Sequence, residues 1–253
     1  MRAVRIAVLM PAYNEEQRLV RTLAELAEHL RAEVGVTVCV FLVDDGSVPP
    51  ISDDVVPASH ALRVVLARHE VNLGQGAAIE TARRLALDPR FASEEGAFDA
   101  YVTMDSDGQH RPQDVQALAL AVTRGVDVAL GNRFAGGSDV PSSRRVLLTL
   151  ARLFERLTTG LTLSDAHNGL RAFSPRAIGR MQLRQNRMAH ATEITRRISL
   201  ASSAGREAER LRLVEVPVAV RYTDESLAKG QKASGAVAIV VDLFQGFLFG
   251  KGS

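Results

Sequence analysis

The chain has 253 residues, of which 46% are hydrophobic and 24% are charged, and its formal net charge at pH 7 is +2. These values are typical of a globular protein with a substantial core, and they exclude both a disordered chain and a polycation that binds nucleic acid over its whole surface. No uninterrupted apolar run reaches roughly 18 residues, so no membrane-spanning helix is predicted. The single cysteine, Cys39, lies in an apolar run and is expected to be a buried thiol in a reducing compartment.

Apolar strand-like runs alternate with amphipathic helical patterns through the first half of the chain. This alternation predicts an α/β fold in which right-handed βαβ units build a Rossmann-like, mostly parallel central sheet flanked by helices. The run 48–59 is rich in turn-forming residues and is expected to be a surface loop. The expected strands are 4–10, 36–43, 62–67, 99–104 and 126–130, and the expected helices are 15–31, 74–87 and 112–122.

The second half of the chain has a weaker pattern. Helices are expected at 142–161 and 189–201, an extended segment at 169–173, and a strand at 214–222 whose internal proline places it at a sheet edge. Residues 234–250 are apolar apart from Asp242 and Gln245. We therefore predict a domain of residues 1–233 followed by an apolar C-terminal helix, 234–253.

Polar, turn-forming residues follow each of the first five predicted strands. In an open parallel sheet, ligands bind at the carboxyl ends of the strands. Asp105 and Asp107 follow the fourth strand, and two hard oxygen ligands on one loop suit Mg²⁺ or Mn²⁺, with Gln109 adding a carbonyl oxygen. A solvated turn has the same composition. The position of the segment among five such loops favours the metal site.

The loops after the second and third strands are candidates for nucleotide contact. Asp44 and Asp45 are placed to accept hydrogen bonds from a nucleobase or ribose, although a turn or helix cap uses the same residues. Gly74 and Gly76 form an incomplete glycine fingerprint, because Ile79 stands where a third glycine is needed. They still mark a place where backbone can approach a nucleotide.

Four segments in order, 11–15, 43–47, 72–76 and 105–110, resemble the family 2 glycosyltransferases of the GT-A fold. The similarity is closer to the dolichyl-phosphate mannose synthase group and its bacterial polyprenyl-phosphate relatives. It covers nearly the whole chain and is specific at the level of the family. It continues through 131–133, Arg144, Arg145, 165–171, Glu193 and 215–218.

The resemblance implies a donor site for a UDP- or GDP-sugar. Asp105, Asp107 and Gln109 would bind the metal ion and, through it, the donor diphosphate, which makes both aspartates catalytic. The nucleoside would lie among residues of the first three strand-end loops, namely Pro11, Ala12, Tyr13, Glu15, Asp44, Asp45, Gly74 and Gly76.

The resemblance also implies an acceptor site. Arg133, as a third catalytic residue, would receive the acceptor phosphate together with Arg144 or Arg145, since arginine forks match phosphate oxygens. A surface charge is the alternative for each arginine. Asp165 and Glu193 are expected near the sugar, and the alternative for Asp165 is to orient Arg171. The substrate-binding set on this side is therefore Arg144, Arg145, Asp165, Arg171 and Glu193.

Two departures from the family pattern narrow the range of acceptors that we expect. The chain has no Glu-Asp dipeptide, which members that glycosylate a hydroxyl usually carry, and it has no tryptophan for the motif of processive synthases. A lipid phosphate fits both absences, because its second pKa of about 6 leaves it largely ionised without a base. His110 and His190 are expected to be structural or surface histidines.

These observations predict an inverting transfer of a hexose from a nucleotide sugar to a polyprenyl or dolichyl phosphate. The alternatives are transfer to a soluble hydroxyl and a nucleotide-sugar-binding protein without turnover. The protein is expected in the cytoplasm, free or peripheral at the membrane, and without a nucleic-acid partner. The helix 234–253 is expected either to bind a membrane surface or membrane protein, or to pack on the domain or a second subunit of a homodimer.

Overall fold

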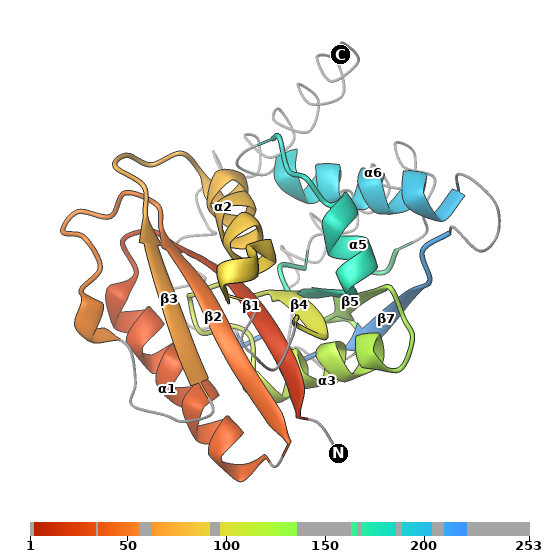
Figure 1. Cartoon of the computed structure of the whole chain (residues 1–253), viewed down its shortest axis with the longest axis horizontal. Coiled ribbons are helices and arrows are strands. Elements are labelled where there is room, and N and C mark those ends of the chain that lie inside the picture. The colour runs from red at the N-terminus through yellow and green to blue at the C-terminus, as the bar shows by residue number, and fades with distance from the viewer. Residues whose placement is uncertain are drawn as a thin grey trace.

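The computed structural model describes residues 3–33, 35–55, 62–91, 97–135, 163–165, 168–185, 189–203 and 210–221. Within these residues, seven strands form one sheet in the order β3-β2-β1-β4-β6-β5-β7 (Figure 1). The strands are β1 (Val4–Ala12), β2 (Val36–Asp44), β3 (Leu62–Arg68), β4 (Ala100–Thr103), β5 (Val128–Asn132), β6 (Arg171–Phe173) and β7 (Leu213–Pro217).

The sheet is mostly parallel, as predicted. β1 pairs in parallel with both β2 and β4, β2 with β3, and β5 with β7, whereas β6 runs antiparallel between β4 and β5. The chain moves outward from β1 to β3 and then returns to add β4 on the other side of β1. The strand order therefore reverses between β1 and β4, and in open sheets a crevice for ligands forms at the carboxyl ends of such a pair.

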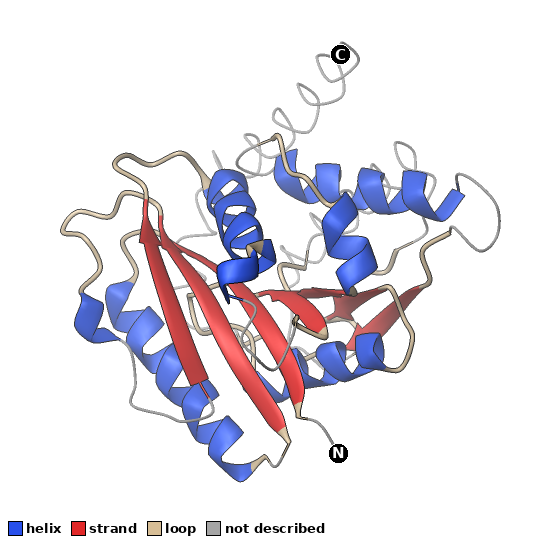
Figure 2. Ribbon diagram, viewed as in Figure 1, coloured by secondary structure: helices blue, strands red, loops and turns tan. Residues whose placement is uncertain are grey.

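Helices cover both faces of the sheet (Figure 2). α1 and α3 lie on one face, and α2, α5 and α6 lie on the other. The helices are α1 (Glu16–Ala32), α2 (Gln75–Leu87), α3 (Pro112–Thr123), α5 (Pro175–Arg180) and α6 (Ala189–Ser203), with single 3₁₀ turns η1 (Asp53–Val55) and η2 (Pro89–Phe91).

The alternation of side chains along β1 explains the two layers of helices. Ile6 and Val8 belong to the hydrophobic cluster that contains Leu23 of α1, whereas Ala7 and Leu9 belong to the cluster that contains α2 and α6 residues. Successive strand residues point to opposite faces, so an apolar strand of this kind must be covered twice. All four of these strand residues are 0–1% exposed.

The structure corrects several predicted boundaries. β5 begins at Val128 instead of 126 and ends at Asn132. The sequence did not predict α5, a short helix whose first turn is capped by Ser174: its Oγ accepts a hydrogen bond from the Ala177 amide at 3.1 Å. β7 lies at the sheet edge as predicted, but it ends at its proline, Pro217.

Other predictions fall outside the described residues, namely the helix 142–161 and the apolar helix 234–253. The division into 1–233 and 234–253 stays a prediction. Where the chain is described, no helix has both the length and the hydropathy needed to cross a membrane.

Candidate active site

The loops that follow β1 and β4 meet at the reversal point of the sheet. The Met104 amide donates to Leu9 O at 3.1 Å, which extends the β1–β4 pairing to the end of β4. Thr22 Oγ1 of α1 donates to Ser106 O at 3.1 Å, so the helix that follows the first loop also holds the second one. The predicted metal loop, 105–110, therefore starts at the crevice that the topology creates.

Asp105 is held from three sides. Its Oδ1 accepts a hydrogen bond from Gln75 Nε2 at 2.9 Å, and its Oδ2 lies 3.3 Å from His110 Nε2. Gly169 packs against the same carboxylate: a Cβ atom added to Gly169 would lie 3.0 Å from Asp105 Cγ and closer still to Oδ2. The carboxylate keeps 33% of its surface exposed, so it is oriented by protein contacts and remains accessible from the crevice.

Asp107 turns toward Gln109. Its Oδ1 accepts from the Gln109 amide at 3.0 Å and its Oδ2 from Gln109 Nε2 at 2.6 Å. Gln109 thus presents its amide nitrogen to Asp107, and it would have to rotate to offer an oxygen to a metal. No cluster of three or more His, Cys, Asp or Glu suited to a metal ion is found among the described residues. A metal here would complete its shell from substrate and water, as Mg²⁺ usually does.

The two aspartates have opposite electrostatic environments. Burial works against ionisation of Asp105, but the hydrogen bond and charge of His110, together with the charges of His190 and Arg171, outweigh it and lower the pKa of Asp105. Burial and then the charge of Asp105 raise the pKa of Asp107, and Glu15 adds to this, against the hydrogen bond from the Gln109 amide. Part of the rise in the pKa of Asp107 is thus repulsion from the Asp105 and Glu15 carboxylates, which a cation bound beside Asp107 would relieve.

Asp44 and Asp45 shape the loops beside the crevice. Asp44 accepts hydrogen bonds from the amides of Ser47 and Ile51, both at 2.9 Å. Asp45 accepts from the amides of Leu73 and Gly74 at 3.0 and 2.8 Å. Both carboxylates are buried, so their described contacts are those of loop supports. Their contact with a nucleobase or ribose stays a prediction.

The glycine turn brings α2 to the metal loop. Gly74, at the N-cap of α2, has φ 97°, which favours glycine, and Gly76 is buried in the first turn. Gln75, between them, is the residue that reaches Asp105. The turn therefore lies beside the diphosphate site predicted from the sequence, although the sequence did not single out Gln75 itself.

The loop after β1 is joined to the loop after β2. Asn14 has φ 52°, its amide donates to Ser47 Oγ at 2.9 Å, and its Oδ1 accepts from the Val48 amide at 2.9 Å. Pro11 and Ala12 are buried at the end of β1, whereas Tyr13 is 47% exposed. Contact of this exposed tyrosine ring with a nucleobase stays a prediction.

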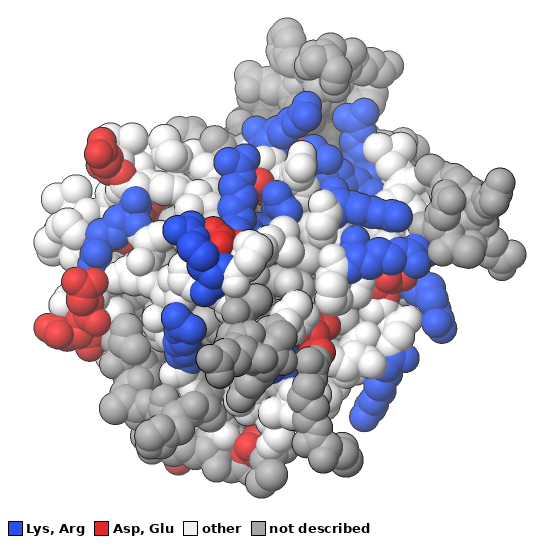
Figure 3. Space-filling view, viewed as in Figure 1, with Lys and Arg blue, Asp and Glu red and all other residues white. Residues whose placement is uncertain are grey.

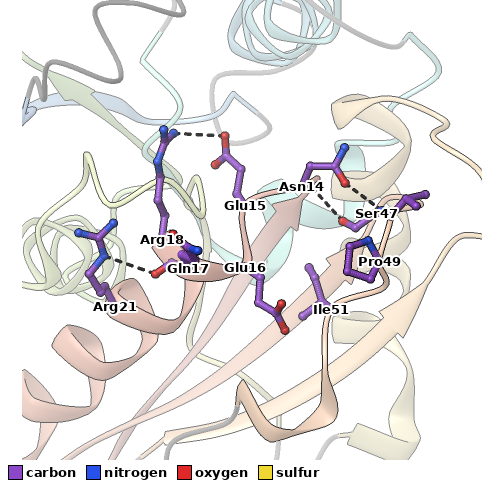
Figure 4. A pocket seen from close by; sticks show the side chains of 10 residues that line it. Asn14, Glu15, Glu16, Gln17, Arg18, Arg21, Ser47, Pro49 and Ile51 are labelled. Atoms are coloured by element: carbon purple, nitrogen blue, oxygen red, sulfur yellow. Dashed lines mark hydrogen bonds and ion pairs between the residues drawn. The ribbon is translucent and has the colours of Figure 1, made fainter.

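A pocket of about 410 Å³ opens on the α1 side of this loop (Figure 4). It is lined mainly by polar side chains, and Glu15 pairs with Arg18 across it at 3.5 Å. Among the residues predicted to bind substrate, Glu15 is the one that lines it. The lining residues are Asn14, Glu15, Glu16, Gln17, Arg18, Arg21, Ser47, Val48, Pro49 and Ile51.

Arg133 is fixed by Asp165. Its Nε lies 2.6 Å from Asp165 Oδ2, and its backbone amide donates to the same oxygen at 3.0 Å. Asn168 Nδ2 also donates to that oxygen at 3.0 Å. The described partner of Asp165 is Arg133, because β5 and the segment before β6 bring the two side chains together. The alternative that Asp165 orients Arg171 stays a prediction. Arg171 is buried in β6 and acts on Asp105 through its charge.

Glu193 supports the segment that precedes α6. Its Oε2 accepts from the amides of Arg184 and Gln185, both at 2.8 Å, and its Oε1 accepts from Arg197. These contacts give it a structural role, and its approach to the sugar stays a prediction. Arg144 and Arg145 lie outside the described residues.

Three residues of the site were missed by sequence reasoning: Gln75, His110 and Gly169. His110 is 5% exposed and was expected to be structural, yet it contacts Asp105 directly. Gln75 lies next to the glycine turn and within the segment 72–76 that carries the resemblance. Gly169 lies within the segment 165–171 of the same resemblance, but the sequence did not indicate its contact with Asp105, which is 64 positions away.

Comparison with known proteins decides the family. The profile described as "Glycosyl transferase family 2" matches residues 7–181. The chain belongs to glycosyltransferase family 2. The match begins in β1 and ends just after α5, and it contains both aspartates of the metal loop.

Similar family members include two enzymes named for lipid acceptors. The chain is 27% identical to the UDP-N-acetylglucosamine--dolichyl-phosphate N-acetylglucosaminyltransferase of Methanococcus voltae, over 89% of each chain. It is 28% identical to the undecaprenyl-phosphate mannosyltransferase of Micrococcus luteus, over 94% of this chain and 91% of that one.

A solved structure supports the fold. Glucosyl-3-phosphoglycerate synthase from Mycobacterium tuberculosis, crystallised with Mn²⁺, UDP-glucose and phosphoglyceric acid, superposes with a TM-score of 0.56 at 20% identity, covering 96% of this chain and 79% of that one. At this identity the similarity establishes the GT-A architecture alone, which confirms the fold that the sequence resemblance predicted.

Proposed function

We propose that this glycosyltransferase moves a hexose from a nucleoside-diphosphate sugar to a polyprenyl phosphate. The observation that carries the proposal is the placement of Asp105 and Asp107 at the β1–β4 reversal point, with Asp105 oriented by Gln75 and His110. The two relatives named above carry dolichyl phosphate and undecaprenyl phosphate in their names, and the chain matches nearly their full length.

The aspartate pair fits a divalent cation that carries the donor diphosphate. Hard carboxylate oxygens two positions apart on one loop suit Mg²⁺ or Mn²⁺, and a cation there would relieve the repulsion between Asp105 and Asp107. Bound there, the ion would neutralise charge on the departing nucleoside diphosphate. The glycine turn at the start of α2 lies beside that position and would offer backbone amides to the phosphates.

On the acceptor side, the enzyme has to position the acceptor phosphate and does not have to remove a proton from it. A phosphate monoester oxygen is already anionic near neutral pH, with a second pKa of about 6, so it attacks the anomeric carbon without a general base. The bond from that carbon to the donor diphosphate breaks as the new bond forms on the opposite face, which inverts the configuration. Asp165 sets the orientation of the Arg133 guanidinium, and we assign Arg133, with Arg144 or Arg145, to the acceptor phosphate.

A donor screen tests this function. UDP-, GDP- and dTDP-sugars are incubated with Mn²⁺ and a short-chain polyprenyl phosphate, and release of nucleoside diphosphate and glycolipid is measured. Asp107→Asn, which keeps the size of the side chain, should lower kcat by at least about 100-fold, since a lost contact to developing charge costs that much in other enzymes. Asp54→Asn, an exposed carboxylate on η1, is the matched control and should retain activity. Full activity of Asp107→Asn would remove the metal loop from the mechanism.

A soluble phosphate-bearing acceptor is the second candidate. It is favoured by one observation, the structural similarity to the synthase crystallised with phosphoglyceric acid. The same screen with 3-phosphoglycerate in place of the polyprenyl phosphate separates the two. Turnover with the soluble acceptor and none with the lipid would replace the first proposal by the second.

A further inference from the structure

The outer surface of α2, α5 and α6 carries a concentration of positive charge. Figure 3 shows Arg side chains gathered over these three helices. We call this surface the basic face. Its exposed arginines are Arg84 on α2, Arg176 and Arg180 on α5, and Arg196 on α6, together with Arg184 and Arg210, whose backbones bond to Glu193 and Arg176.

The acidic side chains of the same elements are few. Glu80 and Glu193 are the acidic residues of α2, α5, the segment 181–185 and α6. Glu80 is 7% exposed and bonds to Arg83, to the Leu183 amide and to Arg84 of the basic face, whereas Glu193 bonds to the segment before α6 and to Arg197. Both carboxylates are turned inward, so the surface that faces solvent is dominated by guanidinium groups.

An apolar side chain accompanies the arginines on α6. Leu200 is 57% exposed and stands four residues after Arg196, so the two share one stripe of the helix. A helix with arginines beside an exposed leucine suits the boundary between lipid headgroups and acyl chains. Because the whole chain carries a formal charge of only +2, the basic face is a local feature and not a consequence of overall composition.

The basic face adjoins the active site. α6 begins next to the metal loop, where the buried His190 in its first turn contributes to the charge that stabilises the Asp105 carboxylate. The same helix continues outward to Arg196 and Leu200. A partner bound to the basic face would therefore lie within one helix length of the site where a phosphate acceptor would react.

We propose that the basic face docks the enzyme on an anionic lipid surface. The inference rests on the proposed function, since a lipid acceptor is what brings this enzyme to a membrane. Each guanidinium near such a surface contributes attraction that falls off within a Debye length, about 8 Å at physiological ionic strength. The arginines hold the headgroups while Leu200 enters the interface.

Vesicle sedimentation of the full chain tests the docking. Phosphatidylcholine vesicles are compared with vesicles that also contain phosphatidylglycerol, without any sugar donor. The chain should bind the anionic vesicles, and Arg184→Glu/Arg196→Glu should weaken binding by at least about 30-fold, because roughly 1 kcal/mol is lost for each arginine removed and each glutamate adds repulsion. The matched control, Arg63→Glu/Arg124→Glu, makes the same change in net charge at exposed positions on β3 and after α3, and it should bind like the unmodified chain.

The outcomes separate docking from catalysis. Equal loss in both double variants, or no loss in either, overturns the basic face as the docking surface. Tighter binding of a single-stranded oligonucleotide than of anionic vesicles, abolished by the same variant, would assign the face to nucleic acid instead. Transfer to a water-soluble short-chain polyprenyl phosphate is measured in parallel, so failure of docking with intact transfer, or the reverse, identifies which proposal is wrong.

Discussion

At the residue scale, the orientation of one carboxylate depends on a glycine that the motif does not contain. Gly169 leaves no space for a Cβ, because Asp105 Cγ would lie 3.0 Å from it. Gln75 and His110 hold the two oxygens of the same carboxylate. The sequence predicted Asp105 from its position after a strand. The three residues that orient it lie in segments of the family resemblance, but their contacts with Asp105 depend on the fold and no local pattern showed them.

We expect Gly169→Ala to displace Asp105 and lower kcat by about 100-fold, the cost that a misplacement of about 1 Å can carry. Overpacking should also cost roughly 1–3 kcal/mol in the free energy of unfolding. Both are measured, by transfer assay and by urea unfolding. Gly179→Ala on α5 is the control, since no atom of its surroundings lies within 4 Å of the position that the added methyl group would take, and activity should persist. A Gly169→Ala enzyme with unchanged kcat would show that the orientation of Asp105 does not depend on its packing against Gly169.

At the scale of elements, the first half of the fold could be predicted closely and the second half only in part, with α6 starting at the predicted residue. α1, β2 and α2 start or end within one residue of their predicted bounds, because long periodic or fully apolar runs specify them. β6 has three residues and α5 has six, too few for a period to be read. The reversed direction of β6 depends on pairing with β4 and β5, which no local pattern encodes.

The roles of residues in the loops could not be predicted from the sequence either. Asp44 and Asp45 were predicted as ligands of a nucleoside, and the structure shows each accepting two or more backbone or side-chain donors from neighbouring loops. The chemistry of a carboxylate that binds a ribose and of one that supports a loop is the same. Only the folded positions of the amides separate the two roles.

Asp45→Asn should therefore loosen the loop between β3 and α2. Asparagine replaces one acceptor oxygen with an NH₂ group facing backbone amides, and a buried unsatisfied group costs about 1–3 kcal/mol. The free energy of unfolding should fall by that amount, and hydrogen exchange at the Leu73 and Gly74 amides should accelerate relative to the β1 core. Unchanged protection of these two amides would contradict the support role.

At the scale of the whole molecule, the site exists only where five distant segments meet. The β1–β4 reversal brings together 11–15 and 105–110, the neighbouring strands add 44–47 and 72–76, and the antiparallel β6 brings Gly169 behind Asp105. A ligand that contacts several of these segments must stabilise the fold as a unit, because it binds the native chain and not the unfolded one.

We expect a nucleoside diphosphate and Mn²⁺ together to raise the melting temperature more than either alone. At about 100 times its dissociation constant a ligand adds about 2.7 kcal/mol, and for a chain of this size each kcal/mol corresponds to roughly 2–4 °C, so the shift should be about 5–10 °C. UDP, GDP and dTDP are compared by thermal unfolding, and the nucleotide that stabilises most identifies the donor class. EDTA should abolish the joint effect, as should Asp107→Asn, while Asp54→Asn should leave it intact. Stabilisation that persists in EDTA would mean that the nucleotide is held by the loops alone, with Asp105 and Asp107 binding no cation in the complex.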